Sequence, residues 1–301
     1  MKKLEMKLIG LLSRGLYGFG MALALVSCSK EEALTPTNGA EPMIYTLPQG
    51  NHPYDETLVK VSETYGCAVL YKFNSSDFRW NQVTKPLGYA AVEGDEAHVG
   101  EVVDFMFKGN LELGSEKLIK KLLPYRIFLA SAIWPLTENP KSPTLYDTVK
   151  TNPQTIIPGF KHLAIGVANA GFSSYTAAQK QTMRGALHYN LWQLALTSRS
   201  IEMPPAFGLV TDYSSTNFLN LLMRPNENGL LFFPSGVGVS AMIDLQCYMQ
   251  EMAKYTEAEF AAKYLIPSVD VKGLIKKKYD IVRNYYLLHY DTDVQIFGNA
   301  R

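Results

Sequence analysis

The sequence predicts an α+β fold, with a small sheet in the first half of the chain and mostly helices in the second half. Its 301 residues are 47% hydrophobic and 19% charged, a composition typical of a globular chain with a sizeable core. Strand-like apolar runs come early and helical patterns come late. The two kinds of element do not alternate as they would in a doubly wound sheet, which favours the α+β class.

Three apolar or aromatic runs predict the strands of this sheet: residues 67–73, 126–134 and 162–169. We expect Pro135 to end the second strand. The stretch 135–158 is rich in Pro, Thr and Asn and predicts a long loop. Loops of that length are often functional.

Helical spacing predicts seven helices, at residues 55–65, 99–107, 115–123, 176–198, 240–253, 257–264 and 271–289. The clearest start is Thr176-Ala-Ala-Gln179, which has the capping-box pattern. Ser115 is a suitable N-cap for the third helix, and Pro124 is expected to end it.

The first 27 residues have the features of a secretory signal peptide. Four basic side chains precede an apolar stretch at 15–26, which is shorter than the about 20 residues of a membrane-spanning helix. The ending Leu25-Val-Ser-Cys28 resembles the bacterial lipobox. That resemblance implies cleavage before Cys28 and a lipid on its thiol. An ordinary secreted leader with a chance cysteine is the alternative.

Glu31-Glu32, close behind the cysteine, resembles the surface-export tag of Bacteroidetes lipoproteins. The predicted location is therefore the cell envelope, as an outer-membrane lipoprotein exposed at the surface and held in the membrane through Cys28. Residues 28–52 are rich in Pro, Thr, Asn and Gly and predict a flexible tether. Residues 53–301 then form a single domain.

Two cysteines remain after the leader, Cys67 and Cys247. We favour the interpretation that both are buried small hydrophobic side chains, although one disulfide between them stays open. The formal net charge is +1, and no basic run appears. The sequence therefore gives no reason to expect nucleic acid as a partner.

One constellation is informative about chemistry: the predicted helix at 176–198 contains His188-Tyr-Asn-Leu-Trp192. Zinc peptidases carry His-Glu-x-x-His on such a helix, because positions i and i+4 face the same way. Two imidazoles then hold the metal while the Glu serves as general base. In that frame Tyr189 stands in the place of the Glu, and Trp192 stands in the place of the second His.

In this helix and in several further segments, the chain resembles the zinc-binding metallopeptidase lipoproteins of Bacteroidetes. These are substrate-import-associated proteins encoded beside outer-membrane nutrient importers. The resemblance is carried by the following segments: Tyr65–Tyr71 with Asp77 and Trp80, Tyr125–Leu129, the helix at 176–198, Pro204–Phe207, Ser240–Tyr248 and Lys276–Tyr286. It implies a zincin-like metallopeptidase fold for residues 53–301. It also places Asp244 where the family has an acidic residue after the zinc helix.

The departures from that pattern predict a degenerate member without an intact catalytic site. A catalytic zinc needs three protein ligands and an open position, whereas His188 and Asp244 would supply only two. Tyr189 cannot replace a carboxylate base, since the pKa of an ordinary tyrosine is about 10. We therefore expect no zinc cofactor and no hydrolysis.

Two functions from different classes follow from this prediction. The first is a binding or accessory lipoprotein that holds a peptide or a glycan, or that docks on an outer-membrane importer complex. The alternative is an active zinc-dependent peptidase whose metal site is rebuilt from His162, His98, His289 or distant carboxylates. If the resemblance fails, only an α+β envelope lipoprotein remains.

Overall fold

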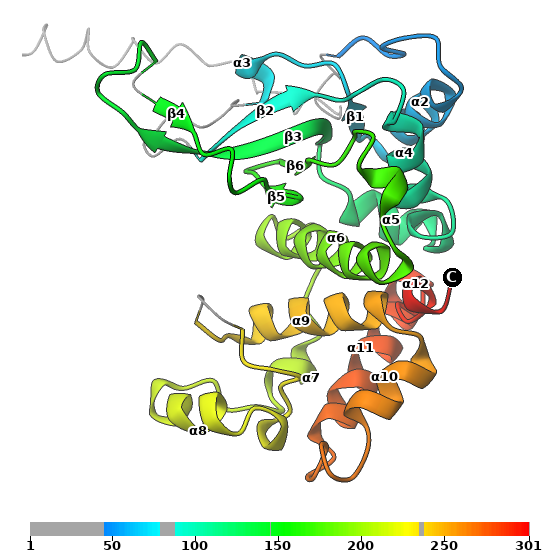
Figure 1. The fold of residues 1–301 in the computed structure, drawn as a ribbon. Coiled ribbons are helices and arrows are strands. Elements are labelled where there is room, and N and C mark those ends of the chain that lie inside the picture. The colour runs from blue at the N-terminus through cyan, green and yellow to red at the C-terminus, as the bar shows by residue number, and fades with distance from the viewer. Residues whose placement is uncertain (1–44, 79–87, 145, 235–237, 301) are drawn as a thin grey trace, which may run out of the picture. The chain divides into compact units, whose positions relative to one another are not determined.

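The sheet is organised around one long strand, β3, which pairs with four of the other strands (Figure 1). This computed structural model describes residues 45–78, 88–144, 146–234 and 238–300, all of which belong to one compact unit, Met43–Arg301. The strands are β1 (Ala68–Leu70), β2 (Tyr89–Glu93), β3 (Arg126–Glu138), β4 (Tyr146–Thr148), β5 (Ile156–Pro158) and β6 (His162–Ile165).

The first part of β3 lies in a four-stranded sheet with the order β1-β3-β6-β5. β1 and β6 run parallel to β3, and β5 is antiparallel to β6 at the edge. The second part of β3 is an antiparallel arm between β2 and β4. Both faces of the first part are buried: Ile127 packs in the main core, and Phe128 packs in a smaller core behind the sheet.

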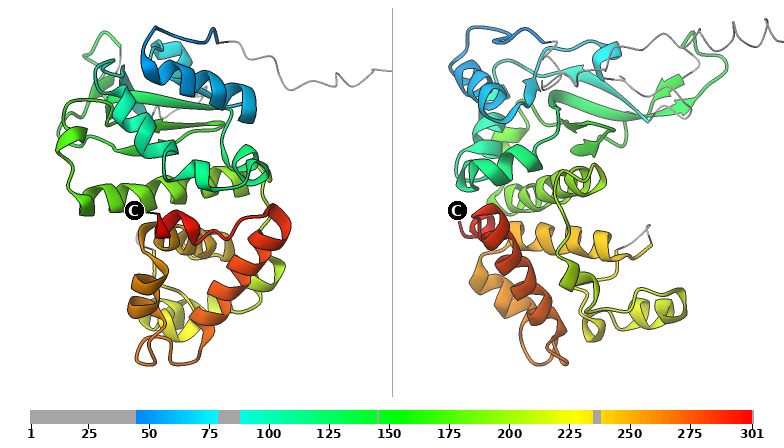
Figure 2. Two further views of the ribbon diagram at one scale, coloured as in Figure 1. Left: turned by 90° about the vertical axis from the view of Figure 1, so that its right-hand side faces the viewer. Right: turned by 180° about the vertical axis from the view of Figure 1, so that it is seen from behind.

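Helices cover the sheet and fill the rest of the described chain (Figures 1 and 2). The helices are α2 (Pro53–Tyr65), α3 (Ser75–Phe78), α4 (Val99–Phe107), α5 (Glu116–Leu122), α6 (Ala177–Thr197), α7 (Pro205–Gly208), α8 (Phe218–Met223), α9 (Ala241–Lys254), α10 (Glu257–Tyr264), α11 (Leu274–Tyr290) and α12 (Ile296–Asn299). Short 3-10 turns lie at Leu111–Leu113, Phe172–Ser174, Ser215–Asn217 and Asn226–Asn228. α2, α4 and α5 pack on the β1 side of the sheet.

The long helix α6 separates the sheet from the later helices. On one side it packs against β5, and on another it packs antiparallel against α9. Gln181 Nε2 donates to Lys254 O at 2.9 Å. At Gly185 an added Cβ would lie 3.0 Å from Gln250 O, so a glycine allows the two helices to approach closely.

The α+β class is confirmed, as are all seven predicted helices and all three predicted strands. The helices at 99–107 and 257–264 have the predicted bounds, and the others differ by at most three residues at either end. The predicted end at Pro135 is wrong, because β3 continues to Glu138. Pro135 lies opposite Tyr89, and its carbonyl accepts from Val149 N at 2.8 Å. The predicted loop at 135–158 is also corrected, since it contains β4 and β5.

The predicted leader and lipidation site, including Cys28, lie outside the described residues. Residues 45–52 of the predicted tether lie against the sheet, because Gln49 Oε1 accepts from Tyr71 N at 2.8 Å. Within the described ranges, no helix combines the length and the apolar character needed to span a bilayer. Cys67 and Cys247 are buried and free, as we favoured.

Candidate functional site

The helix α6 has one buried face and one open side, and the predicted site residues divide between them. His188 and Trp192 lie on the buried face, with 1% and 0% of their surface exposed. Tyr189, Asn190 and Gln193 are half-buried and lie toward the open side. The i, i+4 pair His188 and Trp192 therefore points into the core.

The His188 imidazole makes a side-chain hydrogen bond and packs against an aromatic ring. Its Nε2 donates to Asn110 Oδ1 at 2.9 Å, and its ring centroid lies 4.6 Å from that of Phe297. Burial, with a smaller contribution from the charge of Arg184, lowers the pKa of His188 to about 3. The imidazole is therefore neutral at physiological pH and is held as part of the core.

Trp192 fills space between α6 and α11. Its ring meets Tyr286 edge-on at a centroid distance of 4.7 Å. Tyr189 is half-buried, and burial raises the pKa of its hydroxyl, with a smaller contribution from Cys247 on α9. A tyrosine with a raised pKa is protonated at neutral pH and is a poor general base.

Asp244 lies in the first turn of α9, where its carboxylate already has two partners. Lys278 Nζ on α11 donates to Asp244 Oδ2 at 2.5 Å, and the Tyr213 hydroxyl donates to the same oxygen at 2.6 Å. Burial raises the pKa of Asp244 and lowers the pKa of Lys278. The structure thus pairs Asp244 with the ammonium group of Lys278, whereas the polar partner of His188 is Asn110.

The three other histidines considered as replacement ligands lie on different elements. His162 is buried on β6 in register with Arg126, and burial lowers its pKa to about 4. His98 precedes α4, with Nδ1 3.6 Å from Glu101 Oε1. His289 on α11 packs against the Tyr285 ring at 4.3 Å. Among the described residues, no group of three or more His, Cys, Asp or Glu side chains is placed to hold a metal ion.

Two separate cavities lie on the open side of α6, one near the start of β5 and one near its end, and together we name them the α6–β5 groove. The first, about 440 Å³, is lined by Thr155, Tyr175, Ala178, Gln179, Thr182, Met183 and Ala186. The second, about 530 Å³, is lined by Pro158, Gly159, Phe160, Lys161, Gln193, Leu194, Thr197 and Ser198. Both volumes lie within the range of small-molecule sites. This groove was not predicted from the sequence, although Thr182, Ala186, Gln193 and Thr197 are spaced to share one face of a helix.

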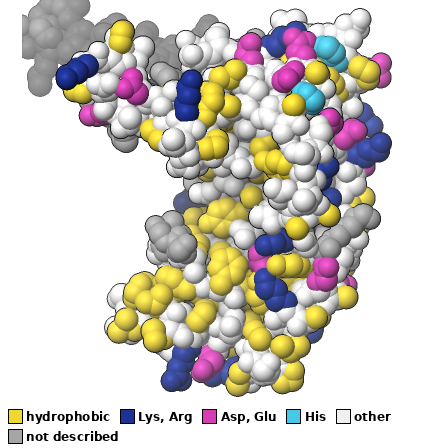
Figure 3. Space-filling model, in the orientation of Figure 1, with side chains coloured by type: hydrophobic (Ala, Val, Ile, Leu, Met, Phe, Trp, Pro, Cys, Tyr) yellow, Lys and Arg dark blue, Asp and Glu magenta, His cyan; other side chains and the backbone are white. Residues whose placement is uncertain are grey.

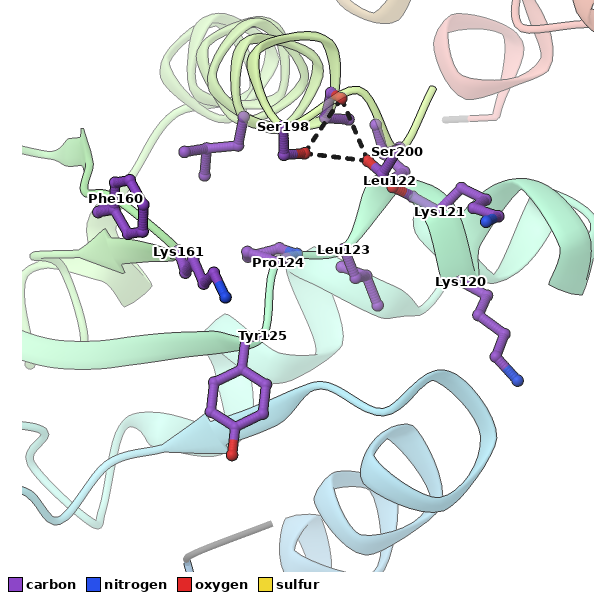
Figure 4. Close-up of a pocket in the computed structure, with 12 residues that line it drawn as sticks. Lys120, Lys121, Leu122, Leu123, Pro124, Tyr125, Phe160, Lys161, Ser198 and Ser200 are labelled. Atoms are coloured by element: carbon purple, nitrogen blue, oxygen red, sulfur yellow. Dashed lines mark hydrogen bonds between the residues drawn. The ribbon is translucent and has the colours of Figure 1, made fainter. Parts of the chain in front are cut away.

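The turn between β5 and β6 forms the far end of the groove. Phe160 at this turn is 68% exposed. A further cavity of about 190 Å³ lies beyond it (Figure 4), where Phe160 and Lys161 face Ser198 at the end of α6 and Pro124 after α5.

Another exposed apolar surface lies over α8 (Figure 3). Four of its side chains are between 42% and 75% exposed: Phe218, Leu219, Leu222 and Met223. Exposed apolar patches of this kind often mark surfaces that contact another molecule.

Comparison with known proteins supports the fold. No protein-family model matches the sequence, and no curated protein matches it. A crystal structure from Bacteroides caccae ATCC 43185, described as a "putative zinc-binding metallo-peptidase", matches with a TM-score of 0.54 and 12% sequence identity. The match covers 82% of this chain and 89% of that chain. The chain therefore has a metallopeptidase-like α+β fold, and at this identity the similarity extends to the fold alone.

Proposed function

We propose that this protein is a cell-envelope lipoprotein that keeps a metallopeptidase-like fold without its zinc chemistry and acts as a binding or accessory component of an outer-membrane nutrient-import system. One observation carries the proposal. The side chains at the positions of the zinc-peptidase pattern, His188 and Trp192, are packed into the core, and Asp244 is bonded to Lys278. None of the three has an open position for a metal and its water.

The orientation of α6 also indicates a second alignment of this helix with the His-Glu-x-x-His pattern, which starts at Tyr189 and not at His188. The side chains on the open side are one residue later: Tyr189 and Gln193 at i and i+4, with Asn190 in the place of the Glu. A phenol and an amide are poor zinc ligands, and an amide is no general base. The alignment that starts at His188 and the one that starts at Tyr189 therefore both lead to the proposal of an inactive site.

The accessory role is supported by two features away from this helix. The lipobox-like segment ending at Cys28 provides a membrane anchor. The apolar surface over α8 provides a docking surface for an importer, since four large apolar side chains are exposed there.

The alternative, an active zinc-dependent peptidase with a rebuilt metal site, is favoured by one observation, the fold shared with a protein described as zinc-binding. It requires replacement ligands from His98, His162, His289 or distant carboxylates within coordination distance of His188. In the described structure the three histidines lie just before α4, on β6 and on α11, each with its own neighbours.

Zinc content and peptide cleavage test the proposal together. The mature chain, residues 28–301 with Cys28→Ser, is purified and dialysed, and its zinc is measured by elemental mass spectrometry. A fluorogenic peptide library is then assayed with the same protein. We expect much less than one zinc per chain and no cleavage. One tightly held zinc per chain, together with cleavage that is abolished by His188→Ala, would refute the proposal.

A further inference from the structure

The α6–β5 groove presents side chains that are polar but uncharged. At helical spacing along this side of α6 lie Thr182, Gln193 and Thr197, all of which line the groove. No lining residue of the first cavity carries a charge, and Lys161 is the one charged lining residue of the second among those described. A ligand that fits such a groove gains nothing from carrying charge.

The polar side chains of the groove also have unused hydrogen-bonding capacity. In the described part of the chain, no hydrogen bond is made by the side chains of Thr155, Gln193 or Thr197. The other polar lining side chains of α6 and its ends, Gln179, Thr182 and Ser198, bond locally. Amides and hydroxyls both donate and accept, so this row matches a ligand that also does both at closely spaced positions.

An exposed aromatic ring completes the arrangement. Phe160 is 68% exposed at the tip of the β5–β6 turn and lines the cavities on either side of it. Figure 4 shows its ring directed toward the end of α6. Such a ring offers an apolar face on which the C–H face of a sugar can stack.

A peptide that adds a strand to the sheet fits this edge less well. β5 contains three residues, and its last residue, Pro158, has no N–H to donate. A short edge that ends in proline gives an added strand few main-chain hydrogen bonds.

We propose that the α6–β5 groove binds a neutral oligosaccharide, which stacks on Phe160 and bonds to the amides and hydroxyls of α6. This inference rests on the proposed binding function and specifies the ligand class of its site. The three features that carry it are the near absence of charge, the unpartnered neutral side chains and the exposed ring.

Isothermal titration of the mature chain with neutral tetrasaccharides (maltotetraose, cellotetraose, xylotetraose and mannotetraose) tests the proposal. We expect at least one to bind with a Kd below roughly 1 mM. Phe160→Ala should weaken binding about tenfold, and Gln193→Leu should weaken it severalfold by removing the amide at constant size. Phe160→Trp should retain binding. Leu288→Ala, at a residue 76% exposed on α11, is the matched control and should change nothing.

The proposal is overturned if no neutral tetrasaccharide binds at millimolar concentration, or if binding is unchanged by Phe160→Ala and Gln193→Leu. It is also overturned if an oligogalacturonate or a neutral hexapeptide library binds in this groove in place of the neutral sugars. Zinc content and peptide cleavage are measured separately on the same protein. Failure of sugar binding is therefore distinguishable from failure of the proposed non-catalytic function.

Discussion

Asp244 and Lys278 form an ion pair of 2.5 Å in the core, with at most 2% of either residue exposed. The pair joins the start of α9 to α11, and Tyr213 contributes a hydroxyl to both members. The resemblance to zinc peptidases predicted Asp244 as a metal ligand. In the structure the positive charge beside Asp244 is the ammonium group of Lys278.

Removing one member of this pair should be costly, because the other charge stays buried without a partner. Lys278→Met should lower the free energy of unfolding by about 3–5 kcal/mol. The double variant Lys278→Met/Asp244→Leu should recover much of that loss, since it removes both charges. Urea denaturation measures all three proteins.

A matched control lies on the same helix. Lys276 pairs with Asp280 at 2.5 Å, but both side chains are about half exposed. Lys276→Met should therefore cost less than about 1 kcal/mol. Equal losses for Lys276→Met and Lys278→Met would contradict the argument from burial.

Acid should destabilise the fold through its buried histidines. The pKa of His188 falls from its ordinary value of 6.5 to about 3 in the folded chain, so the unfolded chain takes up the proton first. The stabilisation is complete above about pH 6.5 and is lost as the pH falls toward 3. At pH 5 the loss from this residue should be about 2 kcal/mol relative to neutral pH.

Denaturation of His188→Gln at both pH values isolates this contribution. Glutamine keeps a donor for Asn110 Oδ1 and does not titrate, so the variant should lose less stability than the parent between pH 7 and pH 5. His162, whose pKa is lowered to about 4, remains in both proteins and gives the common background. Identical acid sensitivity of parent and variant would show that His188 does not contribute.

The two described cysteines should be unreactive in the native protein. Cys67 is 0% and Cys247 is 1% exposed, and burial raises both thiol pKa values, that of Cys247 to about 12. Iodoacetamide should label neither in the Cys28→Ser mature chain and should label both in urea, as mass spectrometry can show. Rapid native labelling of either thiol would contradict the packing described for β1 and α9.

The sequence predicted most of the fold because its long elements carry strong local signals. The helix at 99–107 has regular apolar spacing, and the helix at 176–198 begins with a capping box that the structure contains. The elements that escaped prediction are short. β2, β4 and β5 have three to five residues, too few for an alternating pattern, and α8 has six.

The sequence could not predict in the same way which side of α6 faces the core and which side stays open. α6 is buried over much of its circumference by the sheet, α5 and α9, so apolar residues occur around most of the helix. Its sequence therefore does not mark which side stays open. Only the packing of α6 between β5 and α9 shows that His188 faces the core and that Gln193 faces the groove.

Rebuilding a zinc motif in each frame tests this orientation. The variant Tyr189→His/Asn190→Glu/Gln193→His places His-Glu-x-x-His on the open side of α6. Two imidazoles at i and i+4 should then bind zinc, and added zinc should raise the unfolding temperature by mass action.

The variant Tyr189→Glu/Trp192→His rebuilds the motif around His188. It should lose about 3–5 kcal/mol of stability and gain no zinc, because Trp192 is fully buried against Tyr286. Zinc content by elemental mass spectrometry and thermal unfolding with and without zinc compare the two variants. Zinc binding by the second variant but not by the first would mean that the peptidase frame begins at His188.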